Sequence, residues 1–307
     1  MKDTQHNTKL IGALAVAFSA MLWGVDGILL TPQLYNLNTS FVVFVIHLCP
    51  FLLMNVFFFM EYRLLKTMTR SDLIYFLLIA LFGGALGTLA IVKSLFLLHF
   101  NSLSVVVLLQ KLQPVFAVIL ARIILKEKIK RHFALWACVA LIGGYFLTFG
   151  WSLPDFSTEG ITTVYAALLS LLAAFSFGSS TVFSKKILGN YSFVSSTFFR
   201  YGFTTLIMLV IVLFAGHIGD FSQVTPHNWL FIALIGLTTG SGAIFLYYYG
   251  LRHVKASLST FLELMDPITA VVLDYFVNGT KYSPVQWIAA FVMLFAIVML
   301  NVDRKSK

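Results

Sequence analysis

Long apolar stretches alternate with short polar segments along almost the whole chain. Most stretches hold about 20 residues, which is the length that an α-helix needs to cross a hydrocarbon core of ~30 Å. The pattern therefore predicts an all-α integral membrane protein with ten transmembrane helices. We expect these spans at residues 10–30, 40–60, 72–98, 102–124, 132–150, 163–183, 193–215, 228–250, 256–277 and 284–302.

The second five spans repeat the first five. Pro114 and Pro267 are 153 residues apart, and at the same offset Ile79-Ala80-Leu81 falls on Ile232-Ala233-Leu234. Because five is an odd number of crossings, the second copy must enter the membrane from the opposite side. Inverted repeats of this kind are used by alternating-access transporters. The expected units are a first five-helix repeat at 1–150, an outer linker at 151–162 and a second five-helix repeat at 163–307.

Composition and charge fit this membrane interpretation. Hydrophobic residues make up 59% of the chain and charged residues 11%, against ~25% charged residues in soluble domains. If the N-terminus is inside, the expected outer loops carry only Lys281, and almost all other Lys and Arg outside the spans lie on inner segments. This positive-inside pattern places both termini in the cytoplasm. It also explains the net charge of +9 without a nucleic acid partner.

The fourth and ninth spans carry polar residues that a lipid-facing helix should not contain. They hold Gln110-Lys111-Leu112-Gln113-Pro114 and Glu263-Leu264-Met265-Asp266-Pro267, near the middle of each span. A charge at that depth costs about 2.5–3.5 kcal/mol on insertion scales, and it is usually functional. Helical spacing gathers these side chains on one face of each helix. We therefore expect Gln110, Lys111, Glu263 and Asp266 to form a central substrate and coupling site; the alternative is that Lys111 and Glu263 form a buried pair that only joins the halves.

Several single residues are further candidates for the same cavity. Pro114 and Pro267 should kink their helices and free backbone carbonyls, which either line a cavity or improve packing. Trp23 and Asp26 lie in the outer part of the first span and are further candidates for the substrate and coupling site; Asp26 either faces the cavity mouth or has no part in it. Arg200 has no acidic neighbour in sequence, so it either faces the cavity or extends to the cytoplasmic surface. His47 is either a titrating group in proton coupling or a hydrogen-bonded packing residue.

Motifs for other kinds of chemistry are missing from the sequence. There is no phosphate-binding loop, no His-Glu-x-x-His metal site and no Gly-x-Ser-x-Gly nucleophile. The polar segments between spans are also too short for a soluble catalytic domain. We therefore expect no ATP hydrolysis, no enzymatic activity, no metal and no cofactor.

The order of these landmarks resembles the drug/metabolite transporter superfamily, in particular bacterial members with two EamA-type domains. The segments that carry the resemblance are Ala20-Met21-Leu22-Trp23-Gly24, 102–128 with Pro114 and Lys126-Glu127-Lys128, 173–178, Arg200 and 249–267. The resemblance implies the bacterial inner membrane and substrate exchange through a central cavity between the halves. The chain departs from the family at His47, where an Arg is common, and at Thr280, where an acidic residue would correspond to Glu127.

The sequence thus predicts a secondary transporter for a small polar or amphipathic metabolite. An amino-acid-like zwitterion is favoured, because both Lys111 and Glu263 are placed in the cavity. The expected driving force is a proton gradient or the substrate's own gradient, and export is favoured by analogy with the family. The alternatives are an intramembrane enzyme and a membrane protein without transport activity.

Overall fold

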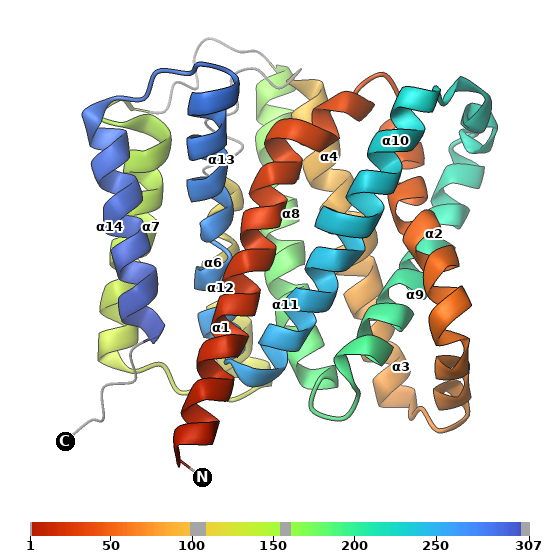
Figure 1. Cartoon of the computed structure of the whole chain (residues 1–307), viewed down its shortest axis with the longest axis horizontal. Helices are drawn as coiled ribbons and strands as arrows, with labels where there is room; N and C mark the ends of the chain where they lie inside the picture. The colour runs from red at the N-terminus through yellow and green to blue at the C-terminus, as the bar shows by residue number, and fades with distance from the viewer. Residues whose placement is uncertain (1, 99–108, 154–160, 302–307) are drawn as a thin grey trace.

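The described residues fold into one helical bundle, and most helices run between its upper and lower faces in the view of Figure 1. The structure, a computed structural model, describes residues 2–98, 109–153 and 161–301 and contains no strand in these ranges. In the first half the elements are α1 (Lys2–Val25), η1 (Asp26–Leu30), η2 (Thr31–Leu34), α2 (Thr39–Phe58), η3 (Phe59–Lys66), α3 (Arg70–Leu78), η4 (Ile79–Leu86), α4 (Gly87–Leu97), α6 (Gln113–Ile124) and α7 (Arg131–Phe149). In the second half they are α8 (Ile161–Ile187), α9 (Phe193–Phe214), η5 (Ile218–Gln223), α10 (Pro226–Ile235), η6 (Gly236–Gly240), α11 (Ser241–His253), α12 (Ala256–Leu262), α13 (Met265–Val277) and α14 (Pro284–Asn301).

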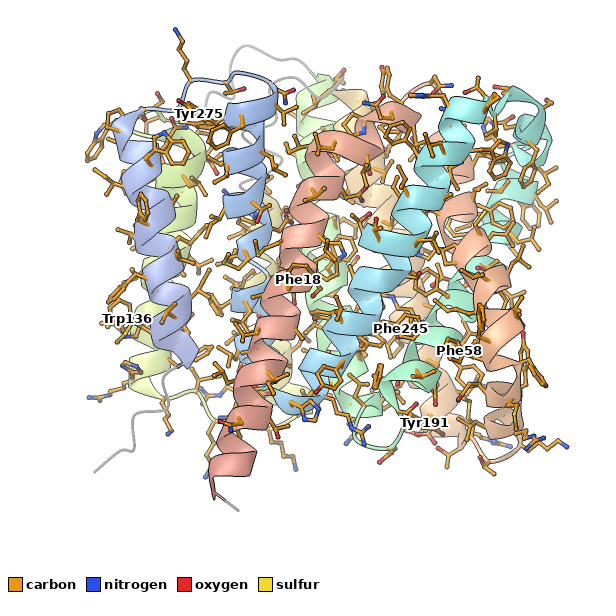
Figure 2. All side chains as sticks on the ribbon, viewed as in Figure 1. Phe18, Phe58, Trp136, Tyr191, Phe245 and Tyr275 are labelled. Atoms are coloured by element: carbon orange, nitrogen blue, oxygen red, sulfur yellow. The ribbon has the colours of Figure 1, made fainter. Side chains whose placement is uncertain are left out.

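Helix length and surface composition make this a multi-pass membrane protein. Within the described residues, eight helical stretches are long and apolar enough to cross a membrane, and two shorter apolar helices lie at Gln113–Ile124 and Pro284–Leu300. Large apolar side chains cover the outside of the bundle; Phe214 is 90% exposed and Phe276 is 75% exposed. Figure 2 shows Phe18 along the side of the bundle, with Tyr275 and Tyr191 towards opposite ends. Apolar side chains exposed over so many helices are typical of a surface that contacts lipid.

Three sequence expectations extend beyond the described residues. The first part of the fourth span, 102–108, lies outside them, and the described part of this span begins at 109. Residues 154–160 of the expected outer linker and residue 302 of the tenth span also lie outside them.

Local signals recur between the two halves. Thr69 caps α3 in a capping box with Asp72, and Thr225 caps α10 in a capping box with Asn228. Each of these helices then passes into a π-helical segment, η4 or η6, and on into α4 or α11. In Figure 1, α3 and α4 ascend through the bundle, whereas α10 and α11 descend. The same succession of elements therefore occurs twice, with opposite directions.

Glycines allow helices from different parts of the chain to approach closely. A Cβ added to Gly24 of α1 would lie 2.6 Å from the backbone oxygen of Asp266 in α13. A Cβ on Gly12 of α1 would lie 3.1 Å from the carbonyl oxygen of Gly250 in α11. Because small residues permit such approach where no hydrophobic effect drives helices together, α1 packs directly on α11 and α13 of the other half.

Candidate functional site

Two membrane helices are interrupted at the positions that the sequence singles out. A turn interrupts the α-helical hydrogen-bond pattern at Lys111–Leu112 before α6 and at Glu263–Leu264 between α12 and α13. Each interruption comes just before a proline, Pro114 or Pro267, which cannot donate a backbone hydrogen bond. Irregular backbone at this depth is tolerated only where protein or water satisfies it. The two breaks thus bring polar backbone and polar side chains into the interior of the bundle.

Glu263 joins the two breaks through hydrogen bonds. Its carboxylate accepts from Nε2 of Gln113 in the first half and from the hydroxyl of Tyr247 in α11 at 2.7 Å. The hydroxyl of Ser259, one turn earlier in α12, lies 3.5 Å away. Tyr247 also shares a hydrogen bond of 2.7 Å with Thr181 of α8. Glu263 is therefore the hub of a polar network that connects four helices.

Lys111 is buried but does not pair with Glu263. Its Nζ donates to the hydroxyl of Thr148 at 2.6 Å and to the carbonyl oxygen of Gly144 at 3.2 Å, both in α7. It is also electrostatically coupled to Asp266. The direct Lys111–Glu263 pair that the sequence left open is thus not formed. Gln110, the remaining member of the expected polar face, is half-buried.

Trp23 and Asp26 reach the same region from the end of α1. The Trp23 ring lies 5.4 Å from the Tyr247 ring, measured between centroids. Asp26 lies near Thr31 and Thr239 and is electrostatically coupled to Asp266. Within the described part of the chain, Oδ1 of Asp26 has no hydrogen-bond partner.

Arg200 is held inside the bundle rather than at its surface. It is 7% exposed, and Nη2 donates to the carbonyl oxygen of Gly83 in η4 at 2.7 Å. Nη1 donates to the hydroxyl of Tyr248 at 3.1 Å, and that hydroxyl also shares a hydrogen bond with Ser184 of α8. Extension to the cytoplasmic surface, considered from the sequence, does not occur. Arg200 instead ties α8, α9, α11 and η4 together.

Sequence reasoning missed several members of this site. Gln113 was placed on the polar face but not chosen, although its position just before Pro114 was a usable signal. Three consecutive tyrosines, Tyr247 to Tyr249, lie at the end of the eighth span, and the sequence could not choose among them. The structure buries Tyr247 and Tyr248. Thr148 lies in an apolar helix, where nothing in the sequence distinguishes it.

A separate cluster closes one end of the bundle. Glu127 accepts hydrogen bonds from the backbone N–H groups of Ala256 and Ser257, at the start of α12, and from the Ser257 hydroxyl. Lys185 donates to two carbonyl oxygens near the end of α11, at 2.8 and 3.0 Å. An anion at a helix start and a cation at a helix end both match the helix dipole. We call this the Glu127 clamp; it borders a cavity of about 400 Å³ lined by Leu125, Glu127, Lys185, Lys186, Gly189 and Asn190.

Comparison with known proteins places these features in context. The model of the EamA-like transporter family matches residues 10–149 and 164–302. The riboflavin transporter ImpX of Fusobacterium nucleatum is 52% identical over 291 residues, covering 94% of this chain and 97% of its own length. The uncharacterized transporter YxxF of Bacillus subtilis is 25% identical over 67% of this chain and 63% of its own length. A solved crystal structure with 16% identity covers 95% of this chain and 96% of its own, with a TM-score of 0.66, which supports the fold alone.

Proposed function

Because the chain belongs to the EamA-like transporter family, we propose that it is a secondary transporter that carries riboflavin or a close flavin analogue by alternating access. The family makes it a transporter rather than an enzyme. The observation that carries the choice of substrate is the 52% identity, over nearly the full length of both chains, to a protein named as a riboflavin transporter.

The chemistry of the site supports an aromatic, hydroxylated substrate. Riboflavin is an uncharged tricyclic ring system with an imide edge and a chain of hydroxyl groups. Trp23 and Tyr247 offer rings at the centre of the site, and aromatic side chains provide much of the contact area in ligand sites. In the described structure the buried hydroxyl of Ser180 has no hydrogen-bond partner and lies beside Gly83, whose carbonyl oxygen accepts from Arg200, so it is available for a polar group of the substrate.

The arrangement of charges favours a flavin over the amino-acid-like zwitterion expected from the sequence. That expectation required Lys111 and Glu263 to face one space as a pair. Lys111 instead donates to α7, and Glu263 accepts from Gln113 and Tyr247. Lys111 and Glu263 are therefore directed to different helices and do not form a pair that would bind both ends of one zwitterion. Amino acids are therefore a comparison substrate in the test below.

We further propose ten transmembrane helices arranged as two inverted five-helix repeats, 1–150 and 163–307. The recurring capping boxes and π-helical segments support the repeat. The opposite directions of the corresponding helices in Figure 1 support the inversion. The substrate site would then lie at the interface of the repeats near the bilayer centre.

The orientation that we propose places the N-terminus, the C-terminus and the Glu127 clamp in the cytoplasm of a bacterial inner membrane. The prediction is tested with single cysteines, after Cys49 and Cys138 are both replaced by serine. In intact cells, a membrane-impermeant maleimide should label Gly219→Cys, which has open space around it. It should label Lys128→Cys only after the membrane is permeabilised. The opposite labelling pattern would reverse the orientation.

We propose proton coupling because several titratable side chains lie in the interior of the bundle. Asp266 is electrostatically coupled to Glu263, Asp26 and Lys111, so three carboxyl groups and one amine share the interior of the bundle. Like charges held close together inside a membrane are costly. A proton bound to one of these carboxylates would lower this cost. We propose that the carboxylate binds the proton when the site is open to one side of the membrane and releases it when the site is open to the other.

Transport by the purified protein in liposomes is the decisive experiment. We expect saturable, protein-dependent movement of radiolabelled riboflavin, which unlabelled riboflavin inhibits and a panel of amino acids does not. An imposed pH gradient should change the transport rate. Comparing liposomes that are loaded with substrate with liposomes that receive it from outside measures the direction of transport, for which the sequence favoured export. Liposomes containing the Glu263→Gln protein are the matched control.

Each outcome of this experiment has a defined meaning. Flux of an amino acid without flux of riboflavin would overturn the flavin proposal and restore the zwitterion. Riboflavin flux that ignores both the pH gradient and the membrane potential would indicate exchange or facilitated diffusion. Absence of flux for both classes would contradict the proposed substrate altogether.

A further inference from the structure

His47 and Arg200 are two basic residues that meet inside the bundle, one from each half. His47 lies in α2 and Arg200 in α9, and their positions differ by the repeat offset of 153. The His47 ring lies 5.3 Å from the ring of Tyr201, the residue after Arg200, and His47 is electrostatically coupled to Arg200. Equivalent residues of an inverted repeat that lie next to each other lie near the repeat axis. Transporters built in this way bind their substrates there.

Among the described residues, Arg200 has no negatively charged partner, and one of its N–H groups has no acceptor. Its partners are uncharged, namely the Gly83 carbonyl, the Tyr248 hydroxyl and the face of the Tyr248 ring at 5.7 Å from the guanidinium carbon. In the described structure no carboxylate forms an ion pair with it, and its Nε–H has no acceptor. A guanidinium that is more than nine-tenths buried is stabilised when acceptors satisfy its remaining donors. Arg200 therefore offers a donor to a carbonyl or other acceptor oxygen.

His47 offers the complementary group. Its Nδ1 lies 2.8 Å from the carbonyl oxygen of Val43, and a carbonyl can only accept, so Nδ1 carries the hydrogen. A second positive charge next to Arg200 in the hydrocarbon core would be costly, so the ring is assigned as neutral. Nε2 is then an acceptor, and it has no partner among the described residues. The pair thus supplies an N–H donor from one half and a nitrogen acceptor from the other.

Resting on the proposed flavin substrate, we infer that His47 and Arg200 form the subsite that recognises the imide edge of the isoalloxazine ring. Nε2 of His47 accepts the hydrogen bond of the flavin N3–H, and Nε–H of Arg200 donates to a neighbouring carbonyl oxygen. An imide presents a donor flanked by two acceptors, which matches this pair. A site built to bond an N–H rejects analogues that lack it, because its own acceptor is left unsatisfied.

Hydroxyl and aromatic groups around the pair fit the same ligand. Ser180 lies against Gly83, whose carbonyl accepts from Arg200, and the Ser180 hydroxyl has no partner in the described structure. It is available to the second carbonyl of the imide. Tyr201, tilted by 37° from His47, contributes a buried aromatic ring beside the subsite.

The test compares riboflavin with N3-methylriboflavin, which lacks the N3 hydrogen. In the unaltered protein in liposomes, the N3-methyl analogue should inhibit radiolabelled riboflavin transport at least tenfold more weakly than riboflavin does. An analogue altered at C8, at the far end of the ring system, should inhibit nearly as well as riboflavin. Because this comparison changes only the ligand, it does not depend on the folding of any variant.

A variant then assigns the effect to His47. In His47→Leu, riboflavin should bind about as weakly as the N3-methyl analogue, and the difference between the two ligands should fall below twofold. His227→Leu removes an exposed histidine at the start of α10, outside the proposed subsite, and should keep the full difference.

The outcomes separate this subsite from the proposed function. If riboflavin is transported but the N3-methyl analogue inhibits equally well, the subsite is wrong and the flavin transporter stands. If the difference persists in His47→Leu, another group accepts the N3 hydrogen and His47 is excluded. If riboflavin is not transported at all, the proposed function fails before the subsite is reached.

Discussion

Replacing Glu263 with glutamine is expected to lower riboflavin transport at least tenfold while leaving folded protein in the membrane. The carboxylate accepts from Gln113 and Tyr247, and an amide in its place has only one accepting oxygen, so it cannot accept from both donors in the same way. Hydrogen bonds to charged groups contribute about 1.5–3 kcal/mol each, and about 1.4 kcal/mol corresponds to a tenfold change. The variant also removes a proton-binding group from the centre of the site. Transport rates in liposomes, normalised to the amount of monodisperse protein, measure the effect.

Asp274→Asn is the matched control for this change. Asp274 lies on the same face of the same interrupted helix, but near its end, where it accepts from Asn278 and Tyr282. We expect its transport rate to stay within about twofold of the parent, because these local hydrogen bonds are exposed or part-buried and remote from Glu263. Normal transport by Glu263→Gln would remove Glu263 from the substrate and coupling site and leave it a structural role.

Replacing Gly24 with alanine is expected to destabilise the protein and slow transport together. The added Cβ would lie 2.6 Å from the Asp266 oxygen and 2.9 Å from Cβ of Thr269, so α1 and α13 must move apart. Overpacking of this kind typically costs about 1–3 kcal/mol. The movement would occur at Asp266, inside the proposed coupling site. Thermal unfolding in detergent and transport in liposomes give the two measurements.

Gly27→Ala provides the comparison within the same segment. A Cβ at Gly27 meets no atom within 4 Å, and its backbone has no positive φ. We therefore expect unfolding temperature and transport to match the parent. Equal behaviour of the two alanine variants would show that α1 and α13 are not held together by the close approach at Gly24.

The sequence was most informative where burial makes a polar residue costly. The polar faces around Lys111 and Glu263 were visible because charge inside a ~30 Å apolar span demands an explanation. Trp23 and Asp26 were placed near the same site on their depth alone. The repeat offset was visible from matched positions such as Pro114 and Pro267.

Partners across the bundle could not be predicted, because they depend on how helices rotate against each other. Lys111 and Glu263 were expected to face one space, yet each has its own partners in other helices. The π-helical segments η4 and η6 were not predicted either, because the apolar residues of η4 and the glycines and threonines of η6 also occur in ordinary membrane helices. Glu127 was noticed as an acidic residue with no counterpart at Thr280. Its contact with α12 was out of reach, because the two are 129 residues apart.

The Glu127 clamp has a consequence for the order in which the chain is assembled. α12 receives no side-chain cap from its own N-cap residue, Lys255, so its first amides depend on Glu127 from the first half. During synthesis the ribosome delivers this carboxylate well before Ala256 emerges. The cap is therefore already present when the helix that needs it enters the membrane. In a circularly permuted chain that began with the second half, the amides of Ala256 and Ser257 would be synthesised first and would lack this acceptor until Glu127 was made.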